Sequence, residues 1–156
     1  MRKIKSLVLA VIGLLCSISV SAQDFGVDGI YYNITSSTDI TVEVTGFYLN
    51  EYSGAFTIPE SVTCNGKTYS VTSIGYRAFE SCSGLTSVVI PESVTSIGPG
   101  AFYDCSGLTS VLIGNSVTSI GDNAFDCCYS LTSVTSHIPA NKLFTIANSV
   151  FSGVDK

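Results

Sequence analysis

The side chains that could do chemistry are few, and they do not form a catalytic set. His137 is the single histidine, and no acid or nucleophile stands at a spacing that suggests an acid–base pair. Serines recur at one repeated position, but outside the G-x-S-x-G setting that exposes a nucleophile. They are Ser87, Ser110 and Ser133. We therefore expect no enzymatic activity and no cofactor.

Three acidic residues follow a recurring phenylalanine and could line one ridge of the molecule. They are Glu80, Asp104 and Asp126. Several oxygen ligands of this kind would suit Ca²⁺. The close D-x-D spacing of a calcium loop is missing, so solvated surface charges are the favoured interpretation. We expect no metal site.

Three cysteines recur with a spacing of 23 residues, at positions 82, 105 and 128. A disulfide needs Cβ atoms that face each other. Stacked chain segments, roughly 4.8 Å apart, point equivalent side chains in the same direction instead. We therefore expect Cys82, Cys105 and Cys128 to form a buried ladder of reduced thiols. Cys127 falls in a polar column and should be more exposed than Cys128.

The cysteines belong to a long internal repeat. Residues 85–107 read LTSVVIPESVTSIGPGAFYDCSG, and residues 108–130 read LTSVLIGNSVTSIGDNAFDCCYS. Self-similarity at such a period indicates a repeat solenoid. One unit cannot cover its own apolar side chains, so successive coils must stack.

Each repeat predicts short β-strands plus a short helical turn. Leu85, Val88 and Ile90 alternate as the inward side of a strand, and 94–97 is a second extended stretch. The spacing of Ala101, Phe102 and Cys105 suits one turn of helix. Two buried columns should follow, with equivalent Cα atoms roughly 5 Å apart. Their members are Phe79, Phe102 and Phe125, and Ile74, Ile97 and Ile120.

The words IPESVTSIG, GAFYDCSGLTSV and NAFDCCYSLTSV resemble the leucine-rich-repeat class, and more closely its BspA-like subfamily of bacterial surface repeats. The resemblance covers roughly residues 53–134. It implies a right-handed solenoid with a sheet on one face, in an exported protein of a host-associated anaerobic bacterium or a protist. It also implies binding or adhesion to an extracellular protein, such as a host matrix protein, and no catalytic residues.

Residues 1–22 are predicted to be a secretory signal peptide. Arg2, Lys3 and Lys5 precede an apolar stretch over 7–20, and Val20 and Ala22 suit a cleavage site. The stretch is short for a membrane anchor, and the residues before Cys16 do not favour lipidation. We expect a secreted or cell-surface protein with no membrane insertion after cleavage.

The remaining chain, 23–156, is acidic. It has four Lys or Arg against twelve Asp or Glu, a net charge of −8. This balance argues against nucleic acid as a partner.

The flanks depart from the repeat. Residues 23–57 are predicted to be an N-terminal β capping region, with a hairpin formed by 29–34 and 41–49 that covers the first edge of the solenoid. Repeats span 58–134, and the first carries an inserted hairpin over 62–71, marked by Asn65-Gly66. Residues 135–156 are expected to be an irregular, truncated repeat. Either the sequence is a fragment of a longer protein, or the protein continues in longer related forms.

The outward residues of the strands are the candidate partner-binding site. They are Thr86, Ser87, Val89, Thr109, Ser110, Leu112, Thr132, Ser133 and Thr135. We expect a non-catalytic module that binds an extracellular protein there. The alternatives are a plain polar sheet surface and a structural spacer or stalk of a longer surface protein. The pairs at 76–77, 99–100 and 122–123 vary between repeats and are expected on a loop.

Overall fold

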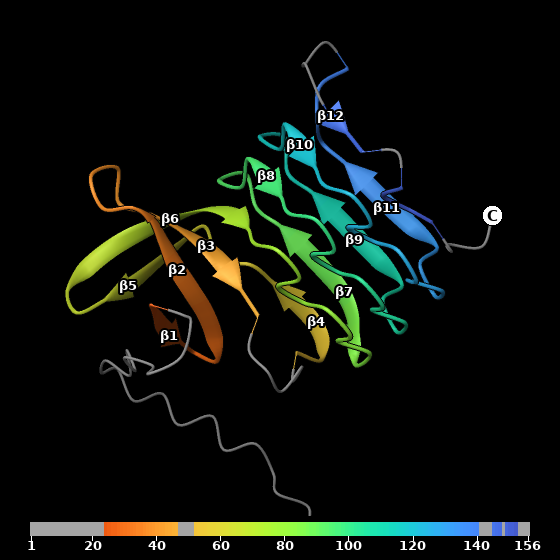
Figure 1. Cartoon of the computed structure of the whole chain (residues 1–156), viewed down its shortest axis with the longest axis horizontal. Coiled ribbons are helices and arrows are strands. Elements are labelled where there is room, and N and C mark those ends of the chain that lie inside the picture. The colour runs from red at the N-terminus through yellow and green to blue at the C-terminus, as the bar shows by residue number, and fades with distance from the viewer. Residues whose placement is uncertain (1–23, 47–51, 141–144, 148, 153–156) are drawn as a thin grey trace, which may run out of the picture.

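The computed structural model describes residues 24–46, 52–140, 145–147 and 149–152 (Figure 1). The predicted signal peptide lies outside these residues. The described part of the chain contains twelve strands and no helix. The strands form two sheets, which we call sheet A and sheet B.

Sheet A has eight strands and runs the length of the molecule. Its order is β1-β2-β3-β6-β8-β10-β12, and β5 pairs with β6. From β3 to β12 this path is parallel. The strands are β1 (Phe25–Val27), β2 (Ile30–Ser36), β3 (Thr41–Thr45), β5 (Ser61–Cys64), β6 (Lys67–Ile74), β8 (Ser96–Ile97), β10 (Ser119–Ile120) and β12 (Thr145–Ile146).

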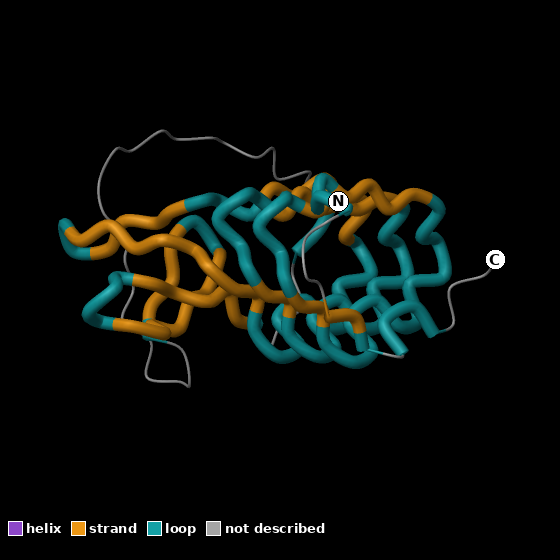
Figure 2. The backbone as a smooth tube through the Cα atoms, turned by 90° about the horizontal axis from the view of Figure 1, so that it is seen from above, coloured by secondary structure: helices purple, strands orange, loops and turns teal. Residues whose placement is uncertain are grey.

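Sheet B has four parallel strands, one from each coil, in the order β11-β9-β7-β4. They are β4 (Gly54–Thr57), β7 (Leu85–Ile90), β9 (Ser110–Ile113) and β11 (Ser133–Ser136). Figure 2 shows successive coils stacked along the molecule, with loops joining the two sheets. The predicted strand Leu85–Ile90 is confirmed, and so is the extended stretch that ends at Ile97.

The core consists of columns of equivalent side chains. The rings of Phe79 and Phe102 lie 4.9 Å apart, and those of Phe102 and Phe125 5.1 Å apart, nearly parallel in both pairs. Ile74, Ile97 and Ile120 are buried and occupy paired positions in β6, β8 and β10. Both predicted columns are therefore confirmed.

The predicted helical turn at 101–105 is wrong. Two β-turns replace it, in which Ala101 N donates to Gly98 O (3.2 Å) and Cys105 N to Phe102 O (3.3 Å). The third residue of each turn has positive φ, 62° at Gly100 and 56° at Asp104, as type II turns require. A left-handed residue at every fourth position interrupts a right-handed helix.

These turns are joined to the neighbouring coils by backbone hydrogen bonds. The amides of Arg77, Phe79 and Ser81 donate to the carbonyls of the next coil at 3.1, 2.7 and 2.8 Å. Gly100 and Phe102 repeat this with the following coil at 2.8 Å. The turn segment therefore connects coils as the two sheets do, although it contains no strand.

The N-terminal hairpin is present as β2 and β3, and β1, which we did not predict, pairs with β2. β3 pairs in parallel with β6, so the hairpin extends sheet A beyond the first coil. Its stabilising role as a cap stays a prediction. The inserted hairpin is also present as β5 and β6, with positive φ at Asn65 and Gly66, as a two-residue type I′ turn requires.

The C-terminal segment continues the stack in spite of its irregular spacing. β12 pairs with β10, Phe125 N donates to Val150 O (2.9 Å), and the Phe151 ring stacks 5.5 Å from Phe125. Val134, which the strand register aligns with the buried Val111 and Val88, is 44% exposed. The reason is that β11 ends sheet B and no described strand covers it.

The predicted cysteine ladder is confirmed in its burial and its free thiols. Cys82, Cys105 and Cys128 are buried and unbridged, and Cys127 is only half-buried. Cys105 Sγ donates to Phe79 O (3.0 Å), and Cys128 Sγ donates to Phe102 O (3.2 Å). The column thus links each coil to the one before it.

Replacing the central ring should weaken the whole stack. Phe102→Ala is expected to lower the free energy of unfolding by about 3–5 kcal/mol, because the ring is fully buried between two others. Phe151→Ala is the matched control, since that ring is 40% exposed and should matter less. Urea denaturation measures both. Equal losses would contradict the column as the main source of stability.

The thiols should differ in reactivity. A thiol-specific reagent applied to the folded protein at neutral pH should label Cys127 first and leave Cys82 unlabelled. Burial raises the pKa of Cys82 to about 11. At neutral pH Cys82 is therefore protonated, and a thiol is far less reactive than a thiolate. Peptide mapping by mass spectrometry identifies the labelled residue. Labelling of Cys128 before Cys127 would overturn this assignment.

Candidate protein-binding surface on sheet B

The outward face of sheet B presents two columns of equivalent side chains. The strand register places Ala55, Ser87, Ser110 and Ser133 in one column and Thr57, Val89, Leu112 and Thr135 in the other. Inward residues such as Val88 and Val111 are buried between them along the chain. Parallel pairing therefore brings Ser87, Val89, Ser110, Leu112, Ser133 and Thr135 onto one surface, as predicted.

The threonines at or just before the start of β7, β9 and β11 have a different role. Thr109 Oγ1 donates to Thr86 O (2.8 Å), and Thr132 Oγ1 donates to Thr109 O (3.3 Å). The amides of Thr109 and Thr132 donate to the same carbonyls. Although Thr86, Thr109 and Thr132 are exposed, the hydroxyls of the last two are used between coils. This flank of the predicted patch is structural as well as exposed.

A groove of about 360 Å³ lies at the carboxyl ends of β4, β7 and β9. Val89 and Leu112 of the predicted surface line it, both half-buried. The other lining residues include Pro59, Glu60, Pro91, Glu92, Gly114 and His137. Our sequence interpretation missed these because they follow the strands instead of alternating within them.

The groove owes its shape to a change of residue between coils. Pro59-Glu60 and Pro91-Glu92 follow β4 and β7, whereas Gly114-Asn115 follows β9. A Cβ atom on Gly114 would lie 2.6 Å from the Pro91 carbonyl oxygen, closer than such atoms approach. The absence of a side chain there lets the coils approach and leaves space above the third coil.

Carboxylates border the apolar floor of the groove. Glu92 Oε2 accepts a hydrogen bond from Asn115 N (2.8 Å), and its Oε1 lies 3.8 Å from His137 Nδ1. Glu60 is exposed at the first coil. The described residues hold ten Asp or Glu against Lys67 and Arg77. The groove therefore combines apolar side chains on its floor with carboxylates on its rim.

Residue spacing alone does not indicate that His137 has an acidic neighbour, because Glu92 lies two coils away along the chain. His137 N also donates to Ile113 O (2.9 Å), which holds this segment beside the groove. Both side chains are about half exposed. No serine or cysteine is among the residues that line the groove with them.

The acidic ridge does not converge. Glu80 is paired with Arg77 (2.6 Å), and Asp104 accepts from Ser81 Oγ at 3.5 Å. No group of three potential metal ligands gathers anywhere in the described residues. Nor do those residues include a helix that could cross a membrane.

The sequence profile of a family described as "BspA type Leucine rich repeat region (6 copies)" matches residues 53–156. The chain belongs to this family. Comparison with proteins of curated function found no match. The stacked coils agree with this leucine-rich-repeat family, and they contain β-turns where we predicted a helical turn.

Solved structures of bacterial leucine-rich-repeat proteins share the fold. One from Bacteroides capillosus is 32% identical with a TM-score of 0.70, over 84% of this chain and 94% of its own. A leucine-rich cell-surface protein from Faecalibacterium prausnitzii is 29% identical with a TM-score of 0.60, over 83% of this chain. The match covers 43% of that protein's length.

Proposed function

We propose that this chain is an exported, non-catalytic module that binds an extracellular protein through sheet B and its groove. The observation that carries the proposal is the groove itself, where half-buried Val89 and Leu112 meet the exposed carboxylates of Glu60 and Glu92. An apolar floor with a charged rim is typical of protein recognition surfaces.

The groove favours a partner segment that places an apolar side chain on the floor and a Lys or Arg beside Glu60. Opposite charges speed association and exclude acidic competitors. A host matrix protein with such a basic, partly apolar segment is our leading candidate. Four strands present less than the roughly 800 Å² per partner of a standard interface, so binding by one chain should be weak.

Location at the cell surface or secretion supports this role. The predicted signal peptide over 1–22 would export the chain, and the similar Faecalibacterium protein is described as a cell-surface protein. Longer arrays of coils would gain affinity by engaging several sites at once.

A structural spacer is the second candidate function. The observation that favours it is the use of the Thr109 and Thr132 hydroxyls between coils. Side chains committed to stacking in this way suit a stalk that holds other domains away from the cell. In that case the groove would have no partner.

The test is binding of residues 23–156 to a panel of purified extracellular-matrix proteins by surface plasmon resonance. Val89→Asp combined with Leu112→Asp should weaken binding at least about tenfold, about 1.4 kcal/mol. Ile34→Asp combined with Tyr129→Asp adds the same charge at exposed apolar sites away from the groove, and should leave binding within about twofold.

Equal loss in both double variants would show that charge alone matters and would contradict a site on sheet B. Absence of binding by the unmodified chain and by a longer array of coils would favour the spacer. Circular dichroism and thermal melting confirm that each variant is folded.

A further inference from the structure

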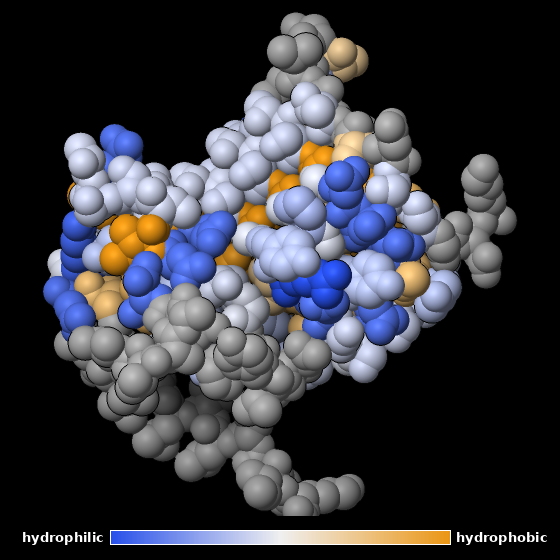
Figure 3. All heavy atoms as spheres, viewed as in Figure 1, coloured by the Kyte–Doolittle hydropathy of each residue, from blue (hydrophilic) through white to orange (hydrophobic). Residues whose placement is uncertain are grey.

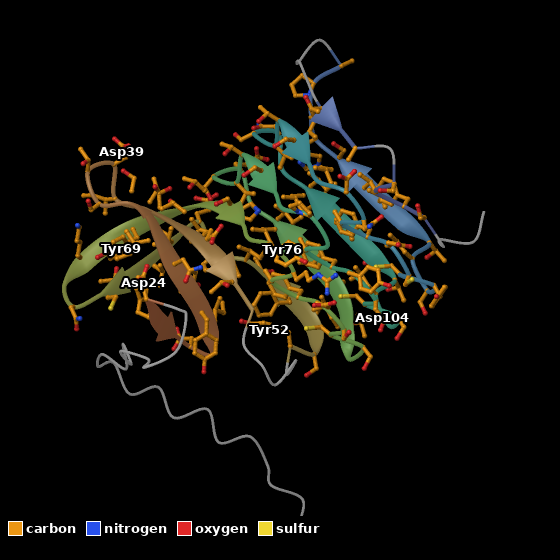
Figure 4. The ribbon with its side chains drawn as sticks, viewed as in Figure 1. Asp24, Asp39, Tyr52, Tyr69, Tyr76 and Asp104 are labelled. Atoms are coloured by element: carbon orange, nitrogen blue, oxygen red, sulfur yellow. The ribbon has the colours of Figure 1, made fainter. Side chains whose placement is uncertain are left out.

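A second hollow, of about 310 Å³, lies on the turn segment, which joins sheet A to sheet B. It is formed by three successive coils, and Tyr76, Arg77, Tyr103, Asp122, Asn123 and Asp126 line it. Figure 3 shows hydrophilic residues gathered over the middle of this face. In Figure 4, Tyr76 and Asp104 lie on the turns of successive coils on the same side.

The hollow exists because two adjacent positions differ from coil to coil. The first coil carries Tyr76-Arg77, the second Pro99-Gly100 and the third Asp122-Asn123. Gly100 has φ 62° and offers no side chain between its larger neighbours. Hydrogen bonds from Arg77 N to Pro99 O (3.1 Å) and from Gly100 N to Asp122 O (2.8 Å) hold the three turns in place.

One wall of the hollow is cationic and aromatic. The Arg77 guanidinium lies 5.3 Å from the Tyr76 ring centre and 5.8 Å from that of Tyr103. Arg77 Nη1 also pairs with Glu80 Oε1 at 2.6 Å. Tyr76 is 67% exposed, so its ring is available to a ligand. This wall offers hydrogen-bond donors and a flat apolar surface.

The opposite wall consists of hydrogen-bond acceptors and an amide. Asp122 and Asp126 contribute carboxylates, and Asn123 can both donate and accept. Tyr103 adds a phenolic hydroxyl, which is protonated at neutral pH and can donate or accept a hydrogen bond. The backbone of this wall is fixed, since Asp126 N donates to Asn123 O (3.2 Å).

The charges select the class of ligand. The carboxylates around the hollow outnumber its one cation, so an anionic ligand would be repelled. A cationic ligand would be repelled by the Arg77 guanidinium, which already lies over one face of the Tyr76 and Tyr103 rings and leaves the other face of the exposed Tyr76 ring open. A neutral molecule with several hydroxyls can use the donors of one wall and the acceptors of the other.

We propose that this hollow on the turn segment binds a neutral sugar, with Tyr76 against its apolar face and Asp122, Asp126 and Arg77 on its hydroxyls. Its volume lies at the lower end of ligand pockets, roughly 300–1,000 Å³, and suits one or two sugar rings. The hollow lies apart from sheet B, so the result of a sugar-binding experiment neither supports nor contradicts protein binding on sheet B.

The experiment is a titration of ¹⁵N-labelled protein, followed by NMR, with galactose, glucose, N-acetylglucosamine and lactose. Sialyllactose is the anionic probe and spermidine the cationic probe. At least one neutral sugar should bind with a dissociation constant of about 1 mM or below, and it should shift the amides of Gly100 and Asn123. Neither charged probe should compete with it.

Tyr76→Ala and Asp122→Ala should each weaken the bound sugar at least about fivefold. Tyr129→Ala is the matched control, because Tyr129 is a 57% exposed tyrosine outside the hollow, and it should leave affinity unchanged. Dispersed spectra show that each variant is folded. Binding by none of the neutral sugars, preferential binding of a charged probe, or unchanged affinity in both hollow variants would overturn the proposal.

Discussion

The structure depends on one constraint, which is that the backbone amides of each coil form hydrogen bonds with carbonyl groups of the neighbouring coils. Parallel strands do this on two sides, in sheets A and B. On the third side the type II turns do it, through bonds such as Phe79 N to Ala101 O at 2.7 Å. Buried amides without partners are costly, so the coils must keep one register throughout. The stacked phenylalanines and thiols follow from that register.

The same constraint explains where the surface can carry a site. Register forces equivalent residues into columns, so a hollow forms only where one coil has a smaller residue than its neighbours. Gly114 is the smaller residue at the carboxyl ends of the sheet B strands, and Gly100 is the smaller residue on the turn segment. Both glycines approach an adjacent coil closely, Gly114 at Pro91 O and Gly100 at the Arg77 side chain. The two hollows that we propose as binding sites are thus interruptions in an otherwise regular stack.

Two kinds of feature could be predicted from the sequence: those that recur with the repeat and turns that a short residue pair specifies. The Phe and Ile columns, the strand Leu85–Ile90 and the hairpin at Asn65-Gly66 are examples. The spacing of side chains does not indicate the positive φ at Asp104. We therefore predicted a helical turn where two β-turns occur. The groove was missed because it joins residues of several coils, as in the contact of Glu92 with His137. The outward positions of Val89 and Leu112 were predicted correctly, because inward and outward side chains alternate along a strand.

Hydrogen exchange of the turn amides tests the central claim most directly. If the turns connect coils as the sheets do, the amides of Phe79, Phe102 and Asp104 should be protected as strongly as those of Val88 and Val111. They should also open together with those strand amides as one cooperative unit. The amides at 37–38 in the exposed turn of the hairpin provide the unprotected reference. Exchange of the Phe102 amide at the rate of that hairpin turn would contradict the account.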